Sequence, residues 1–128
     1  MISDPIAIWH RAVEAKNFAA IEDLLAEDAV FYSPVVHSPQ AGKALTAKYL
    51  RAAMAVLNTP EFRYVGEWRS ERSAVLEFEV KLGGIVVNGV DIIRWNEQGR
   101  IVLFKVMMRP LKALNFIMPL MAGQLQAT

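Results

Sequence analysis

The chain contains no cysteine, and this absence removes several kinds of chemistry at once. Without thiols there can be no disulfide, no thiolate nucleophile and none of the usual zinc-binding frameworks. The two histidines, His10 and His37, lie far apart and have neither HxH nor HExxH spacing. We therefore expect no bound metal.

Long apolar runs and clusters of one charge are also missing. The apolar stretch 111–121 is interrupted by Lys112, Asn115 and Pro119, and it is shorter than the roughly 20 residues that span a bilayer. Fourteen basic residues nearly balance thirteen acidic ones and are scattered, whereas nucleic-acid binding needs clustered positive charge. The first residues lack the basic and apolar regions of a signal peptide. We expect a soluble cytoplasmic protein with no membrane or nucleic-acid partner.

The glycines do not form any of the motifs that hold a cofactor. The sequence has no phosphate loop, dinucleotide fingerprint or nucleophile elbow, and Gly83, Gly84 and Gly89 suit turns and bulges. We therefore expect no organic cofactor.

The chain has more apolar residues than a small core needs. Its 128 residues are enough for one hydrophobic core, yet 54% are apolar and the mean hydropathy is +0.25. Such an excess predicts an internal cavity, a subunit interface or both.

Helical periodicity dominates the first half of the chain. Ser3 or Asp4 before Pro5 is typical of a helix start, Asn17 breaks the pattern, and Pro34 ends a short strand. The predicted elements are helices near residues 5–16, 18–25 and 43–57, a strand at 29–33 and a loop at 34–42.

After Pro60 the period changes from 3.6 to 2. Four strand candidates follow one another with short turns between them, which predicts an antiparallel meander: 62–69, 74–82, 85–95 and 100–109. A helix at 111–125, kinked or restarted at Pro119, ends the chain. The order α-α-β-α-β-β-β-β-α predicts a single α+β domain over residues 1–128, with helices packed on one face of a curved sheet.

Three polar residues on these strands are candidates for chemistry. Asp91 lies in an almost entirely apolar strand, where a carboxylate is either exposed or buried with a raised pKa or a partner. Arg109 ends another apolar strand and can clamp a carboxylate of the protein or of a ligand. Glu79 alternates with apolar neighbours and is typical of a solvated face. A two-residue loop at 83–84 places Leu76 opposite Asp91, whereas a longer loop brings Glu77 there, so the faces depend on register.

Two further residues could reach a cavity from the first strand and the loop after it. Tyr32 could donate a hydrogen bond into a pocket, although a half-buried tyrosine is more often a packing residue. His37 lies between Pro34 and Pro39 in a loop that could overhang a pocket or simply be exposed.

Over nearly its whole length the chain resembles the SnoaL-like branch of the nuclear-transport-factor-2-like superfamily. The resemblance is carried by AVFYSPVVHSPQAGK, by VLEFEVKLGGIVVNGVDIIRWNEQGRIV and by the closing VMMRPL. It implies a cone-shaped sheet around a deep apolar pocket, with helices on the concave face, and frequent homodimers.

The resemblance says less about activity, because this superfamily hosts isomerases, cyclases, hydrolases and binding domains. The cyclases use a buried Asp as general acid/base without metal or cofactor, and Asp91 is the matching type. The epoxide hydrolases use an Asp-Arg-Asp set whose positions fall here on Glu77, Glu79 and Arg109. This inverted order of charges argues against epoxide hydrolysis by the same mechanism.

Three functional hypotheses follow. The first is a cofactor-independent isomerase, cyclase or lyase acting on a small hydrophobic carbonyl compound, with Asp91, Tyr32 and Arg109 as catalytic residues. The second is a non-catalytic binding protein for a hydrophobic acid or metabolite, held by Arg109. The third is a dimerising scaffold with a vestigial pocket. The ligand-contacting residues we expect are Trp9, Val13, His37, Leu50, Glu79, Met107 and Ile117.

Overall fold

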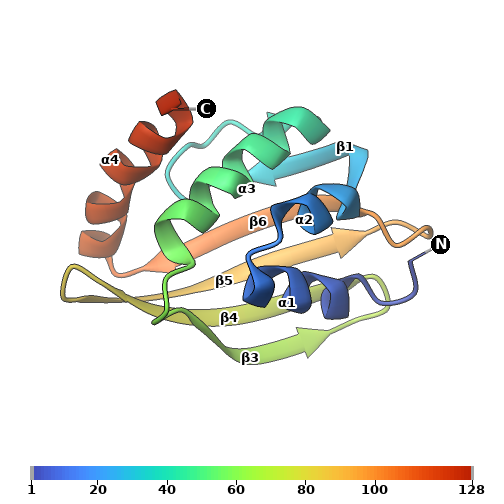
Figure 1. Cartoon of the computed structure of the whole chain (residues 1–128), viewed down its shortest axis with the longest axis horizontal. Helices are drawn as coiled ribbons and strands as arrows, with labels where there is room; N and C mark the ends of the chain where they lie inside the picture. Colours follow the sequence, from blue (N-terminus) through green and yellow to red (C-terminus); the bar gives the residue numbers. More distant parts are fainter. Residues whose placement is uncertain (1, 128) are drawn as a thin grey trace.

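Helices lie over one face of a curved, unclosed sheet in the computed structural model, which describes residues 2–127 (Figure 1). The helices are α1 (Pro5–Ala15), α2 (Phe18–Leu24), α3 (Lys43–Leu57) and α4 (Leu111–Ala127). The strands are β1 (Leu25–Tyr32), β2 (Gln40–Ala41), β3 (Arg63–Arg69), β4 (Ser73–Leu82), β5 (Ile85–Trp95) and β6 (Ile101–Arg109). The α+β prediction is confirmed.

The sheet is mixed rather than wholly antiparallel. Its strand order is β2-β1-β6-β5-β4-β3, and the meander β3 to β6 is antiparallel as predicted. β1 instead pairs with β6 in parallel, because the chain returns from β1 through α3 before it enters the meander. β3 is therefore an edge strand with β4 as its neighbour in the sheet.

Side-chain caps begin the first two helices where the sequence predicts. The Asp4 carboxylate accepts a hydrogen bond from the Ala7 N–H at the start of α1, and Asn17 accepts one from Ala20 at the start of α2. α1 ends at Ala15, and the following residue, the C-cap Lys16, adopts a left-handed conformation. These caps fix where the inward face of α1, with Ile6, Trp9 and Val13, meets the sheet.

The hairpin between β4 and β5 sets the register of the sheet. Gly83 and Gly84 both have positive φ, as a two-residue hairpin loop with the matching twist requires. Leu82 then pairs with Ile85, and Leu76 lies directly opposite Asp91. The shorter of the two loops considered from the sequence is therefore the one that forms.

This register separates the two faces of the sheet. Leu76, Phe78, Gly89, Asp91 and Ile93 lie on the face that the helices cover, and all are buried. The alternate positions of β4, β5 and β6 point to the outer face and are half-buried or exposed. Among them are Glu77, Glu79, Asn88, Lys105, Met107 and Arg109.

Three segments differ from the prediction by more than one residue. β1 begins at Leu25 rather than at Ala29, because Leu25 pairs with Ile101 directly after α2. The expected loop 34–42 contains the two-residue strand β2, which pairs with Val30 and Phe31. The last helix runs through Pro119 as one element and packs beside α3 and against β5 and β6, with Ala113 and Ile117 buried.

Gly89 gives the buried Phe78 ring its space, and replacing it with alanine should destabilise the protein. A methyl group there would lie 2.5 Å from Phe78 Cζ and 2.6 Å from the Met107 carbonyl oxygen. We expect Gly89→Ala to lower the free energy of unfolding by about 1–3 kcal/mol, as overpacking of a core does. Urea denaturation measures this loss.

Gly123→Ala is the matched control, since Gly123 lies in α4 with open space around its Cα. It should leave stability unchanged or raise it by up to about 1 kcal/mol through helix propensity. Equal unfolding midpoints for Gly89→Ala and the natural protein would contradict the close packing at Gly89.

Candidate active site

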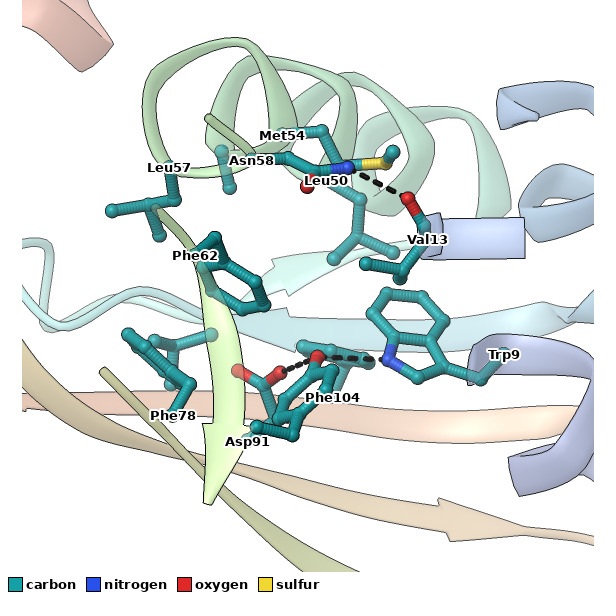
Figure 2. A pocket seen from close by; sticks show the side chains of 13 residues that line it. Trp9, Val13, Leu50, Met54, Leu57, Asn58, Phe62, Phe78, Asp91 and Phe104 are labelled. Atoms are coloured by element: carbon teal, nitrogen blue, oxygen red, sulfur yellow. Dashed lines mark hydrogen bonds between the residues drawn. The ribbon is translucent and has the colours of Figure 1, made fainter. Parts of the chain in front are cut away.

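A narrow apolar pocket lies between α1, α3 and the inner face of the sheet (Figure 2). Its walls come from both layers: Trp9, Val13, Leu50, Ala53, Met54, Leu57, Asn58, Phe62, Tyr64, Phe78, Asp91, Phe104 and Val106. Most of these side chains are hydrocarbon or aromatic, and Asp91 is the one carboxylic acid in the lining. The pocket therefore presents a single carboxylic acid to a mostly apolar space.

Asp91 is held by a chain of two hydrogen bonds that begins on α1. The Trp9 indole N–H donates to the Tyr64 hydroxyl oxygen over 2.9 Å, and the Tyr64 O–H donates to Asp91 Oδ2 over 2.7 Å (Figure 2). Trp9 in turn packs on Phe104, with ring centroids 4.8 Å apart. Both hydrogens point toward the carboxylate, so the chain favours its ionised form.

Burial acts on Asp91 in the opposite direction and is the stronger effect. The residue is 6% exposed, and desolvation raises its pKa from 3.8 to about 7, although the Tyr64 hydrogen bond lowers it. Burial and the nearby Asp91 charge raise the Tyr64 pKa well above its usual value, so that hydroxyl stays protonated. Near neutral pH both forms of Asp91 are therefore populated, as acid/base catalysis requires.

The second oxygen of Asp91 faces the pocket. Oδ2 accepts the Tyr64 hydrogen bond, whereas Oδ1 accepts none from residues 2–127 and is not fully enclosed by protein atoms. A molecule in the pocket would thus meet Asp91 through Oδ1.

The pocket is partly open, but its free space is small. Its free volume is about 40 Å³, room for a few water molecules and far below the ~300 Å³ at the lower end of ligand sites. Asn58 bridges its rim, donating from Nδ2 to the Val13 carbonyl oxygen over 2.9 Å. Side chains on α3 and the segment after it, such as Met54 and Phe62, must move before a larger molecule can enter.

The structure brings four of the residues proposed from the sequence into this pocket. Trp9 and Val13 reach it from α1, Leu50 from α3 and Asp91 from β5. Asp91 is buried rather than exposed, because the hairpin register turns it toward the helices.

The other proposed residues lie elsewhere. Tyr32, His37 and Met107 share a separate, open depression on the far side of β6. Glu79 pairs with Arg63 over 3.1 Å on the outer face. Arg109 lies on that face too, across from Asn88, and Ile117 is buried in the core without lining the pocket.

Neither Tyr32 nor Arg109 therefore stands beside Asp91, and the expectation that one of them assists it is corrected. The strand alternation explains both placements: Lys105 and Arg109 share the outer side of β6, and the Lys105 ammonium lies 5.1 Å from the Tyr32 ring centroid.

Sequence reasoning missed Tyr64 and Asn58. Tyr64 lies opposite Phe78 in the β3–β4 pairing, on the inner face with Asp91. Pairing the two predicted strands at 62–69 and 74–82 could have found it, but an irregularity between Tyr64 and Gly66 shifts the alternation.

Within residues 2–127, no helix is long and apolar enough to cross a membrane. The same residues contain no group of three or more His, Asp or Glu side chains placed to hold a metal ion.

The protein combines a curved α+β fold with a pocket between helices and sheet that contains one buried carboxylic acid. These features are typical of a class of small proteins with an internal pocket. Residues 6–104 match the model of the SnoaL-like domain family, and the chain belongs to this family, within the nuclear-transport-factor-2-like superfamily. The resemblance seen in the sequence is confirmed.

Solved structures agree with this assignment. A steroid delta-isomerase from Pseudomonas aeruginosa is 34% identical, with a TM-score of 0.90, over 96% of this chain and 90% of that one. A protein with a cystatin-like fold from Silicibacter pomeroyi is 32% identical, with a TM-score of 0.81, over 96% and 83%. The epoxide hydrolase/cyclase-like enzyme SalBIII of salinomycin pyran-ring formation is 18% identical, with a TM-score of 0.65, over 84% and 89%, and shows the shared fold alone. No curated protein matches the chain.

The raised pKa of Asp91 predicts a specific dependence of stability on pH. Between about pH 4 and pH 7 the folded protein keeps this proton while the unfolded chain has lost it, so stability falls as pH rises. The difference of about three pH units corresponds to up to about 4 kcal/mol. We expect Asp91→Asn to abolish this fall, as measured by urea denaturation from pH 4 to pH 8.

Asp4 and Glu67 do not obscure this window, because their pKa values are lowered from 3.8 and 4.5 and they titrate at lower pH. Parallel stability curves for the natural protein and Asp91→Asn would show that Asp91 has an ordinary pKa.

Proposed function

We propose that this protein is a metal-free isomerase that moves a proton within a small hydrophobic carbonyl compound, with Asp91 as general acid and base. The observation that carries the proposal is the open Oδ1 of a buried carboxylic acid with a pKa of about 7 in an apolar pocket. The broader description, a pocket protein of a superfamily that includes isomerases and cyclases, rests on the family match.

The reaction begins with ionised Asp91. Its Oδ1 removes a proton from the carbon next to the ligand carbonyl, and the electron pair of that C–H bond passes into an enolate. Because Asp91 is now neutral, it holds the Tyr64 proton less strongly, and the Tyr64 hydroxyl donates to the enolate oxygen instead. Trp9 keeps its hydrogen bond to Tyr64 and holds the phenol in place.

The proton then returns to a different carbon. Asp91 delivers it to the far end of the conjugated enolate, so a carbon–carbon double bond moves by one position and Asp91 is ionised again. No atom is gained or lost and no oxidant is needed. Positioned proton transfer of this kind contributes about 10²–10⁴-fold to the rate.

The relative with 34% identity supports this reaction class, since it is a steroid delta-isomerase. The free volume of the pocket, about 40 Å³, is too small for a steroid-sized substrate. The pocket must therefore widen before such a substrate binds. Met54 at the rim suits this movement, since methionine adapts to irregular shapes.

The alternatives raised by the sequence have less support. A binding protein that holds an acid through Arg109 needs that guanidinium in the pocket, whereas Arg109 lies on the outer face. A scaffold with a vestigial pocket predicts an Asp91–Arg109 ion pair, whereas the partner of Asp91 is the Tyr64 hydroxyl.

A β,γ-unsaturated cyclic ketone tests the proposal. We expect the natural protein to convert it to the conjugated ketone, followed by the ultraviolet absorbance of the product, with a rate that rises through about pH 7 as Asp91 ionises. Asp91→Asn should lose about 10²–10⁴-fold in kcat, since the amide cannot accept the proton.

The control is Asp28→Asn, which removes an exposed carboxylate on β1 and should retain full activity. Testing the ketone in single-ring and steroid forms separates substrate size from chemistry. If Asp91→Asn turns over either ketone as fast as the natural protein, Asp91 is not the acid/base.

The ligand and the assembly remain predictions. Native mass spectrometry of freshly purified protein would detect a co-purifying small hydrophobic molecule, and the same spectra report whether the chain is the homodimer that the resemblance implies.

A further inference from the structure

Three side-chain bonds connect α1 to the edge strand β3. Trp9 donates to Tyr64 inside the pocket, and on the surface His10 Nε2 lies 2.7 Å from Glu67 Oε1. The third bond joins Arg69 to Asp4, the N-cap of α1, over 3.0 Å. The bond that positions Tyr64 is thus one of three along the same helix–strand seam.

Glu67 is the junction of the surface bonds. Its Oε1 accepts from His10, and its Oε2 lies 2.5 Å from Arg69 Nε, so one carboxylate holds two partners from two elements. These hydrogen bonds, first from Arg69 and then from His10, lower the Glu67 pKa below its usual value. The four residues Asp4, His10, Glu67 and Arg69 form what we call the seam network.

Few other bonds hold α1 against β3. Within residues 2–127, no backbone hydrogen bond joins α1 to β3, and β3 pairs with β4 alone in the sheet. Its pairing with β4 is irregular between Tyr64 and Gly66, at the residue that touches Asp91. The His10 ring also meets the Tyr64 ring edge-on, with centroids 5.1 Å apart. The surface network therefore contacts both the helix that carries Trp9 and the tyrosine itself.

We infer that Asp4, His10, Glu67 and Arg69 are positioning residues for the acid/base site. They fix α1 against β3 and thereby keep the Trp9 indole and the Tyr64 hydroxyl in line with Asp91. This role rests on the proposed function, although the geometry it concerns exists in the protein without substrate.

A stabilising role alone makes a different prediction. It predicts that Glu67 substitutions lower the unfolding midpoint, by a small amount because exposed ion pairs contribute little, and leave Trp9 and Tyr64 unchanged. A positioning role instead predicts a change at Trp9 and Tyr64, some distance from the removed charge. The two roles are therefore separated by a probe of the indole N–H.

The experiment uses the indole N–H signal of Trp9 in ¹H–¹⁵N NMR spectra of the full chain, assigned by its loss in Trp9→Phe. We expect Glu67→Ala to move this signal toward the position of a weaker hydrogen bond, in the same direction as Tyr64→Phe. Glu67→Gln keeps some hydrogen bonding and should move it less. The signal should also move in 1 M NaCl for the natural protein, and less for Glu67→Ala, which keeps only the Arg69–Asp4 pair, because salt screens exposed pairs.

Glu22→Gln is the matched control, since it removes an exposed carboxylate that pairs with Arg51 over 3.4 Å between α2 and α3. It should leave the Trp9 signal in place. In the ketone assay, Glu67→Ala should lower kcat by about 3–10-fold, shift the pH profile of the rate to higher pH and leave KM nearly unchanged, as loss of an aligned donor predicts.

An unmoved Trp9 signal in folded Glu67→Ala and Glu67→Gln would overturn the inference. A signal that moves in a protein without ketone turnover would uphold the seam network and count against the proposed function instead, so the two failures are distinguishable.

Discussion

The structure depends on keeping one carboxylic acid in an apolar interior without an opposite charge. Removing Asp91 from water favours its protonated form, and the Tyr64 and Trp9 hydrogen bonds return part of that lost stabilisation to the ionised form. A salt bridge to arginine would hold the acid ionised and inactive as a proton carrier at neutral pH. A neutral donor chain leaves it able to take up and release a proton.

The fold supplies this environment by separating its two sheet faces. The inner face places Phe78, Asp91 and Phe104 under the helices, whereas the outer face carries glutamate, lysine and arginine in contact with solvent. A slip of one residue in the β4–β5 hairpin would exchange the two sets and place Asp91 in water. The paired glycines of that turn therefore bear on the chemistry of the site as well as on the fold.

Much of the architecture could be predicted from the sequence, because its signals are local. The α3 range 43–57 and the β5 range 85–95 follow from periodicity and flanking breakers, and Asp91 stands out as the acid in an apolar strand. The partner of Asp91 could not be predicted in this way. Tyr64 lies 27 residues away in the chain, and its face depends on an irregular strand pairing. Tyr32 and Arg109 have suitable chemistry but fall on positions that alternation turns away from the pocket.

The most direct test is a ¹³C NMR titration of the Asp91 side-chain carboxyl in the natural protein, with the signal assigned by its absence in Asp91→Asn. We expect a midpoint near pH 7, with the folded structure intact on both sides of it. A midpoint near pH 4, the ordinary value for aspartate, would mean that the carboxyl is well solvated, and the acid/base role built on its burial would then be wrong.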